Sequence, residues 1–350
     1  MNQDIPLGLS YDDVLLIPQY SEIESRSDVD LSTQLTPRVK LSLPLISSNM
    51  STVTSTEFAI ALGKLGGLGV IPRFVTADEE ANMVAETKKH KIVVGAAIGV
   101  REEGLERAEL MVKAGADVLF LDVAHGYLEK VLSATKLLSS KFGKYVDIVA
   151  GNVATQEATE ALFKNGADSV KVGIGPGSTC ITRIETGCGV PQITAILESA
   201  KAAKKYGKTI ISDGGMKNSG DIVKALAAGS AAIMTGHMFA GCAETPGKLV
   251  QKGEKIFKQY NGSTSLTEKH NQIKNLGKSL PMNYIFQIEG VETLVPYQGP
   301  LDKVIEKMVA NIRSGFSYCG AHNIQELWQK AKFIRVTTLG SRENGAHNAV

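Results

Sequence analysis

A short run of apolar or β-branched residues, followed by a polar turn and an amphipathic helical pattern, recurs eight times along this chain. Most runs begin about 21 to 29 residues after the previous one, and the longest interval is about 40, which is the length of a strand, a loop, a helix and a second loop. The strand-like runs are residues 44–48, 68–72, 92–97, 117–122, 146–151, 169–173, 209–213 and 231–236.

Helix-like stretches lie between these runs, for example at residues 104–116, 155–167 and 218–230, and each carries a glycine near its end. That glycine suits a left-handed helix cap leading into the next strand. A doubly wound sheet would show fewer strands and a glycine-rich turn after the first of them, whereas the richest glycine loop here follows the sixth run. The pattern therefore predicts one domain over residues 1–350, an α/β fold of the (β/α)8 TIM-barrel class.

Two segments fall outside the repeat. Residues 251–299 are polar and are predicted to form a long loop or flap after the eighth strand, as functional lids often do. Beyond Leu301 we expect an amphipathic helix and then a strand-like run at residues 333–338.

Composition narrows the function classes. The chain has a net charge of +2, its basic residues are scattered, and it contains no apolar run of the roughly 18 residues that a membrane helix needs. We therefore expect no nucleic-acid partner and no membrane insertion. The N-terminus does not look like a signal peptide, which favours a cytoplasmic protein. The four cysteines have neither zinc-site nor disulfide spacing.

Polar residues follow the strand-like runs, and in a barrel these positions meet at one end. They are Asn49, Arg73, Asp122, His125, Asn152, the loop 173–183, Asp213, Gly214, Gly215, Gly236 and His237. His125 lies in a turn and is expected to be a surface residue. For Asp122, Asn152 and Asp213 the alternative to a ligand-binding role is a helix cap or turn former.

The loop VGIGPGSTCITR (172–183) presents Cys180 among glycines and hydroxyl groups. Its main-chain amides could hold an anion, but it lacks the Gly-Lys-Ser/Thr ending of a P-loop, which disfavours nucleotide triphosphate hydrolysis. A lone cysteine is more often a small buried apolar side chain. The polar setting of Cys180 instead favours a nucleophile.

At this loop the sequence resembles the IMP dehydrogenase and GMP reductase family. The resemblance runs nearly end to end and includes LSYDDVLLIP (9–18), SSNMSTVTS (47–55), LDVAHGY (121–127), SDGGMKNSGDIVKALAAG (212–229) and VPYQGPL (295–301). It implies that Cys180 attacks C2 of the purine ring of IMP or GMP, and that hydride passes between that carbon and a nicotinamide.

The resemblance also implies roles for individual residues. Thr182 and Glu289 would act beside Cys180 in catalysis, and Asp122 and Asn152 would line the side that binds the dinucleotide, NAD. A potassium ion would bind at the carbonyls of Gly175, Gly177 and Cys180, completed by Glu343 of a neighbouring subunit in a homotetramer. The purine nucleotide substrate would be held by Ser178, Asp213, Gly215, Gly236, His237, Tyr260 and Gly262.

Three departures from the family pattern stand out. No pair of CBS repeats fits between the second and third strands, so we expect no regulatory domain of that kind. Gly236-His237 stands where the family has Gly-Ser or Gly-Gly. The flap has no arginine between Gly262 and Pro296, although dehydrogenases of the family use an Arg-Tyr pair there to activate water. Lys269, His270, Lys274 and Lys278 are the candidate substitutes.

The remaining motifs look more like those of dehydrogenases, so the sequence favours an NAD-dependent IMP dehydrogenase that oxidises IMP to XMP. The first alternative is a GMP reductase that uses NADPH and needs no water step. The second is a purine-nucleotide-binding relative that has lost turnover.

Overall fold

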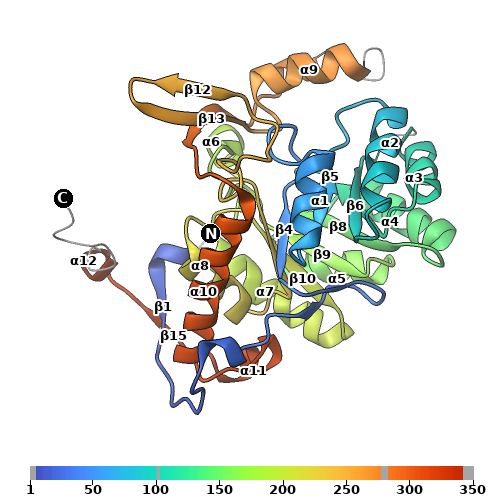
Figure 1. Ribbon diagram of the computed structural model, residues 1–350. Coiled ribbons are helices and arrows are strands. Elements are labelled where there is room, and N and C mark those ends of the chain that lie inside the picture. Colours follow the sequence, from blue (N-terminus) through green and yellow to red (C-terminus); the bar gives the residue numbers. More distant parts are fainter. Residues whose placement is uncertain (1–4, 101–102, 277–282, 342–350) are drawn as a thin grey trace.

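The computed structural model describes residues 5–100, 103–276 and 283–341, and its central feature is a parallel eight-stranded sheet. The sheet closes on itself, because β4 pairs with β11 on one side and the bridge between Ile46 and Leu68 joins it to β5 on the other (Figure 1). Around the barrel the strands are β4 (Leu45–Ser47), β5 (Gly69–Ile71), β6 (Val94–Ile98), β7 (Val118–Asp122), β8 (Asp147–Val153), β9 (Ser169–Val172), β10 (Thr209–Asp213) and β11 (Ala232–Thr235). The predicted (β/α)8 barrel is confirmed.

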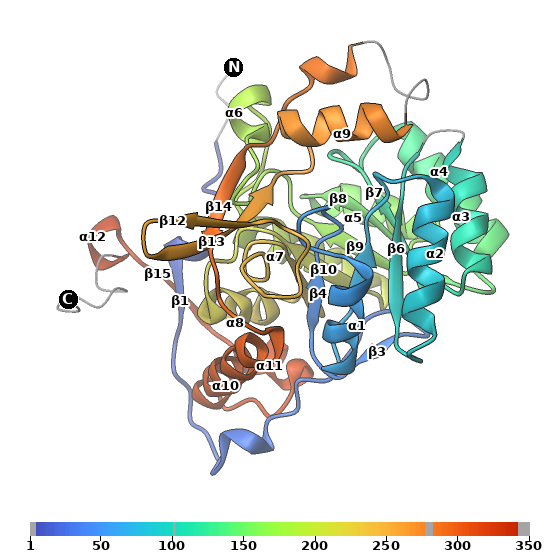
Figure 2. The same ribbon diagram turned by 45° about the horizontal axis from the view of Figure 1, so that its top comes forward.

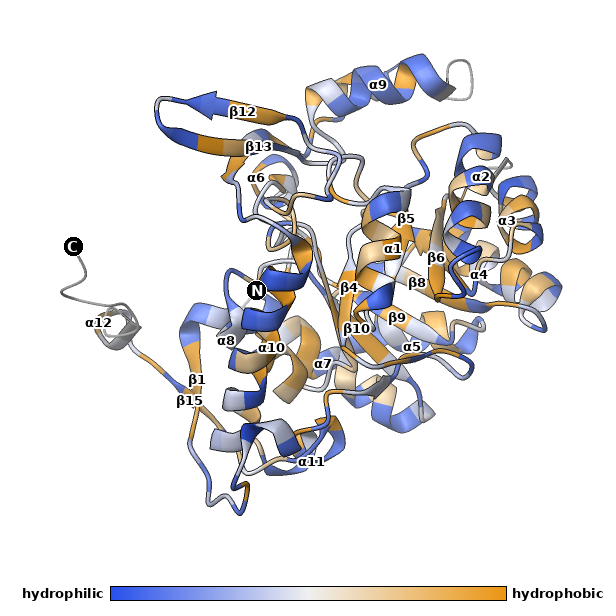
Figure 3. Ribbon diagram, viewed as in Figure 1, coloured by the Kyte–Doolittle hydropathy of each residue, from blue (hydrophilic) through white to orange (hydrophobic). Residues whose placement is uncertain are grey.

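Helices surround this sheet, and their apolar faces pack against it while their charged faces point outward (Figure 3). They are α1 (Thr56–Lys64), α2 (Ala77–Lys88), α3 (Glu103–Lys113), α4 (Glu129–Phe142), α5 (Gln156–Lys164), α7 (Gln192–Tyr206), α8 (Ser219–Ala227) and α10 (Leu301–Tyr318). The expected glycine turns after α5 and α8 have left-handed backbones, with φ of +96° at Gly166 and +117° at Gly229. Residues 72–93 between β5 and β6 hold only α2 and its connections.

A second core fills the barrel itself. Side chains such as Phe120, Val149 and Met234 pack there, and the hairpin of β2 (Thr33–Gln34) and β3 (Lys40–Leu41) adds Leu35 and Leu41 to the same cluster. The amino-terminal end of the barrel is thereby closed by apolar side chains. The carboxyl-terminal end stays free for polar groups.

The flap is more ordered than the sequence suggests. β12 (Leu249–Lys252), β13 (Lys255–Asn261) and β14 (Glu292–Pro296) form an antiparallel sheet, followed along the chain after β13 by α9 (Leu266–Leu276) and, before β14, by a 3-10 turn at Tyr284–Phe286. The expectation of a long loop over residues 251–299 is therefore wrong for most of its length. Figure 2 shows α9 beyond the open end of the barrel.

The physical reason lies in Lys258 of β13. It is 3% exposed and its ammonium donates to the carbonyls of Cys242, Ala243 and Thr245, so a lysine that looks solvent-facing in the sequence is an inward-facing strand residue. The buried charge of Lys258 therefore obscures the strand pattern of β13 in the sequence.

The tail returns to the start of the chain. α10 buries Leu301, Ile305, Met308, Ile312 and Phe316, as its helical spacing predicts. After α11 (Ile324–Lys330), β15 (Phe333–Arg335) pairs antiparallel with β1 (Val14–Leu16), and α12 (Thr338–Ser341) follows. Among the residues that the structure describes, none of the helices combines the length and apolar character that spanning a bilayer requires.

Candidate active site

A cavity of about 320 Å³ opens at the carboxyl-terminal ends of the barrel strands, where barrel enzymes hold their reactive groups. The sequence-predicted site residues that line it come from the ends of five strands, β7 to β11, and from the flap. They are Asp122, Asn152, Gly175, Gly177, Ser178, Cys180, Thr182, Asp213, Gly215, Gly236, His237, Tyr260, Gly262 and Glu289. His125 is exposed and does not belong to the cavity wall, and Glu343 lies outside the described residues.

The loop that carries Cys180 is fixed by main-chain contacts from two directions. Gly173 has a φ of +147°, and a Cβ at this position would lie 2.3 Å from the carbonyl oxygen of Asp213, so only glycine fits. On the other side, the amide of Ile181 donates to the carbonyl of Glu289 at 2.9 Å, and the amide of Val291 donates to that of Thr179 at 2.9 Å. The cysteine loop and the segment before β14 are therefore held together like two short antiparallel strands.

This arrangement connects three side chains in a line. Thr182 Oγ1 donates to Glu289 Oε2 at 2.6 Å, and Cys180 Sγ lies 3.1 Å from Thr182 Oγ1. Because the Thr182 hydroxyl gives its one proton to Glu289, it can accept a proton from the sulfur side. The line can carry a proton from the reacting centre to a carboxylate, or in the reverse direction.

Cys180 differs from the other cysteines in its setting. It is the one cysteine in the cavity wall, and it is partly accessible. Burial raises the pKa of Cys242 to about 12 and also raises that of Cys319, so these thiols stay protonated. Cys188 is exposed outside the cavity.

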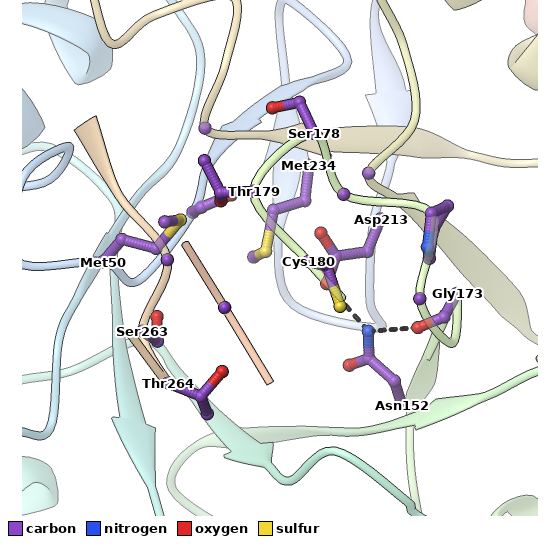
Figure 4. Close-up of a pocket in the computed structure, with 18 of the residues that line it drawn as sticks. Met50, Asn152, Gly173, Ser178, Thr179, Cys180, Asp213, Met234, Ser263 and Thr264 are labelled. Atoms are coloured by element: carbon purple, nitrogen blue, oxygen red, sulfur yellow. Dashed lines mark hydrogen bonds between the residues drawn. The ribbon is translucent and has the colours of Figure 1, made fainter. Parts of the chain in front are cut away.

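A buried lysine joins two carboxylates at the floor of the cavity. Lys171 Nζ lies 2.9 Å from Asp122 Oδ1 and 2.6 Å from Asp213 Oδ2, and the Lys171 side chain is 4% exposed. Asn49 donates to Asp122 at 3.0 Å. Asn152 donates to Asp213 at 2.9 Å and to the carbonyl of Gly173 at 2.8 Å (Figure 4).

The charges in this cluster set its protonation. Burial alone would raise the pKa of Asp122, but the charges of Lys171 and Arg73 outweigh that effect and lower it to about 2. For Lys171 burial lowers the pKa, and the two carboxylates outweigh it and raise the pKa above its ordinary value. Both groups are therefore charged at neutral pH.

The cavity side next to β10 and β11 offers a cradle for an anion. Gly214 and Gly215 both have a φ of +85°, and Gly236 lies so close to Tyr260 that a Cβ would be 2.8 Å from the phenol oxygen. Burial raises the pKa of Tyr260, and the side chains of Thr179 and Ser178 partly oppose this shift. His237 joins this corner, and burial lowers its pKa.

The carbonyls proposed for a monovalent cation lie in the cysteine loop. That of Gly177 accepts the amide of Cys180 at 3.0 Å, while none of the described residues donates a main-chain hydrogen bond to the carbonyls of Gly175 and Cys180. Free carbonyl oxygens are suitable ligands for potassium. The described residues contain no cluster of histidine, cysteine and acidic side chains for a multivalent metal ion.

Three of the candidate flap bases, Lys269, His270 and Lys274, do not line the cavity. Lys269 is 2% exposed and its ammonium lies 3.4 Å from the centre of the Tyr284 ring. His270 and Lys274 are exposed on α9. Lys278 lies outside the described residues.

Sequence reasoning missed the role of Lys171 and gave none to Arg73. A lysine inside the apolar run SVKVG was the available signal, because a cation within a parallel barrel strand needs buried partners. For Arg73 the signal was its position directly after a strand, but its surroundings depend on distant loops.

Comparisons with known proteins agree on one family. The model of the IMP dehydrogenase / GMP reductase domain matches residues 8–347. Inosine-5′-monophosphate dehydrogenase of Cryptosporidium parvum is 38% identical, over 99% of this chain and 96% of its own length. GMP reductase of Leishmania donovani is 32% identical, over 98% and 97%.

A solved structure shows the same relation in three dimensions. GMP reductase from Trypanosoma brucei in complex with guanosine 5′-monophosphate superposes with a TM-score of 0.93 at 30% identity, covering 99% of each chain. These matches extend over almost the whole barrel and its flap. This chain belongs to the IMP dehydrogenase / GMP reductase family.

Proposed function

We propose that this chain is a nicotinamide-dependent oxidoreductase that acts on C2 of a purine nucleoside 5′-monophosphate through a covalent adduct at Cys180. The observation that supports this most is the line of Cys180, Thr182 and Glu289, with contacts of 3.1 and 2.6 Å. A nucleophile, a hydroxyl group and a carboxylate in series can form the adduct and manage its proton. The family membership fits the same chemistry.

The remaining groups would position the substrate. The carboxylate of Asp213 can accept hydrogen bonds from ribose hydroxyls, because Lys171 and Asn152 hold it at the cavity floor. The 5′-phosphate would lie against Ser178, Gly215, Gly236, His237, Tyr260 and Gly262. A potassium ion would be held by the carbonyls of Gly175, Gly177 and Cys180, and would keep the cysteine loop in shape.

In the dehydrogenase direction, the thiolate of Cys180 would add to C2 of IMP, and this adduct would lose hydride from C2 to NAD⁺, which would bind beside Asp122 and Asn152. Water would then attack C2, and the bond between C2 and sulfur would break to release XMP. Glu289, acting through Thr182, can accept the proton of that water. This relay would supply the base that Lys269, His270 and Lys274 do not bring to the cavity.

The reductase direction is the second candidate, and one observation favours it. No basic side chain of the described part of α9 lines the cavity, and a reductase needs no hydrolytic water. Here Cys180 would add to C2 of GMP, and the Thr182–Glu289 pair would protonate the amino group so that it leaves as ammonia. C2 would then accept hydride from NADPH, and its bond to sulfur would break to release IMP and the thiolate.

The deciding experiment is absorbance at 340 nm in potassium buffer, with IMP plus NAD⁺ and, separately, with GMP plus NADPH. A rise with IMP supports the dehydrogenase, and a decay with GMP supports the reductase. Silence in both, with nucleotide still bound, would instead identify a binding protein without turnover. The proposed potassium site is tested by replacing potassium with a larger organic cation, which should lower the rate. The proposed homotetramer is tested by measuring the molar mass by light scattering.

The adduct is tested separately. Cys180→Ala should abolish turnover and the mass increase of the acid-quenched protein while nucleotide binding persists. Cys188→Ala, which removes an exposed cysteine outside the cavity, is the matched control and should behave like the parent chain. Turnover by the Cys180 variant would contradict the proposal.

A further inference from the structure

Gln192 is a buried amide that lies behind the cavity wall and has no part in the chemistry described so far. It is the first residue of α7, it is 2% exposed, and it does not line the cavity. Its Nε2 donates to the carbonyl of Val172 at 2.8 Å and to that of Asp213 at 3.3 Å. Because Val172 ends β9 and Asp213 ends β10, one side chain joins the ends of two barrel strands.

The orientation of the Gln192 amide follows from these carbonyls, since the reverse orientation would place Oε1 against two other oxygen atoms. Nε2 also lies 3.2 Å from the hydroxyl of Ser212, which is 2.9 Å from the buried hydroxyl of Tyr11. Gln192 Oε1 is buried and has no hydrogen-bond partner among the described residues. A buried acceptor without a partner costs stability, so the value of a glutamine here lies in what its N–H groups hold.

The two carbonyls belong to the bases of the two loops that would act on the substrate. The cysteine loop starts at Gly173, directly after Val172, and a Cβ on Gly173 would lie 2.3 Å from the Asp213 oxygen and 3.0 Å from Gln192 Nε2. On the cavity side, Asn152 joins the same pair of loops through the carbonyl of Gly173 and the carboxylate of Asp213 (Figure 4). Two amide side chains therefore hold these loops together, one in the cavity wall and one behind it.

We propose that Gln192 is a positioning residue, which fixes the cysteine loop relative to Asp213 and so keeps Cys180 Sγ within reach of C2 of the purine. This role rests on the proposed function, because it needs a nucleotide whose ribose is bound at Asp213 while Cys180 attacks. A nucleotide bound through its ribose and phosphate has its purine ring in a fixed place. A misplacement of about 1 Å between reacting atoms can cost about a hundredfold in rate.

The test uses Gln192→Met in the full chain, because methionine has a similar length and donates no hydrogen bond. The rate of adduct formation is followed by the mass of the acid-quenched protein with IMP plus NAD⁺ and, separately, with GMP plus NADPH. This rate should fall by about tenfold to a hundredfold, while the dissociation constants of IMP and GMP in calorimetry change by less than about twofold. Gln325→Met, at an exposed position of α11, is the matched control and should behave like the parent chain.

Alkylation by iodoacetamide distinguishes a positioning role from an effect on the thiol itself. This small reagent needs no bound ribose, so its rate at Cys180, measured by mass spectrometry of the peptide, should be the same in Gln192→Met and in the parent chain. Equal slowing of alkylation and of adduct formation would assign Gln192 to the reactivity of the thiol and overturn the positioning role. Unchanged adduct formation would overturn it as well.

A second variant keeps the test decisive if Gln192→Met does not fold. Gln192→Asn retains the amide but is one methylene shorter, so it cannot reach both carbonyls and should show the same fall in rate with unchanged affinity. Equal losses of rate and of nucleotide affinity in this variant would contradict the positioning role. Failure of the unaltered chain to form any adduct would instead overturn the proposed function itself.

Discussion

Lys171→Met is the most informative perturbation of the cavity floor. Lys171 is the shared partner of Asp122 and Asp213, whose side chains are only 22% and 17% exposed. Methionine keeps much of the volume but removes the charge. Two partly buried carboxylates would then face each other without their cation.

The magnitude follows from the charges. Asp122 has a pKa of about 2 instead of 3.8, to which Lys171 contributes together with Arg73 and Asn49, and at about 1.4 kcal/mol per pKa unit the difference corresponds to about 2.5 kcal/mol. Removing one member of a buried ion pair generally costs about 3–5 kcal/mol, because the partner charge stays buried. With Asp213 also losing its contact of 2.6 Å, we expect a loss of about 4 kcal/mol at neutral pH.

The pH dependence gives a second, independent check. In the parent chain the lowered pKa of Asp122 contributes stability above about pH 4, and this contribution is lost as the pH falls toward 2. In the variant the uncompensated carboxylates favour protonation, so they oppose folding most at neutral pH. The difference in stability between the two chains should therefore shrink on acidification.

The assay is urea unfolding of both chains at about pH 7.5 and about pH 4.5. Lys130→Met, at an exposed position of α4, is the matched control and should change stability by less than about 0.5 kcal/mol. A loss below about 1 kcal/mol for Lys171→Met at neutral pH, or an equal loss at both pH values, would refute the reasoning.

Three further predictions concern single side chains. Glu289→Gln keeps an acceptor for Thr182 but cannot take its proton, so kcat should fall by about a hundredfold with little change in nucleotide affinity; an unchanged kcat in steady-state assays would exclude the relay. Gly236→Ala places a Cβ 2.8 Å from the phenol oxygen of Tyr260 and should weaken nucleotide binding in calorimetry, whereas unaltered binding would remove this corner from the phosphate site. Because burial lowers the pKa of His237, the folded chain binds fewer protons than the unfolded chain below about pH 6.5, and stability should rise with pH through that range; His237→Asn should flatten this part of the thermal unfolding profile, and an unchanged slope would contradict the assignment.

The barrel strands were predictable because they are buried on both faces and read as continuous apolar runs. The run at 209–213 coincides with β10, and that at 117–122 differs from β7 by one residue. The flap strands could not be predicted from the sequence, because Lys258 of β13 points inward to main-chain carbonyls and no local pattern reveals this.

The cavity wall could be predicted because the ends of the barrel strands could be predicted. Residues that follow seven of the eight runs line the wall, because parallel strands end on one side. The partners of Lys171 lie about fifty residues away in one direction and about forty in the other, so only the closed barrel shows that one ammonium serves two carboxylates.

The main-chain contacts between the cysteine loop and Glu289 also determine when Cys180, Thr182 and Glu289 can come together. Thr182 and Glu289 are 107 positions apart, and closing so long a loop has an entropic cost that early local structure does not offset. Cys180 is synthesised just after the sixth barrel strand, whereas Glu289 is synthesised only near the end of the flap. During synthesis the thiol therefore exists before the carboxylate that would handle its proton in the proposed chemistry, so the line of three side chains can form only after the flap has been made.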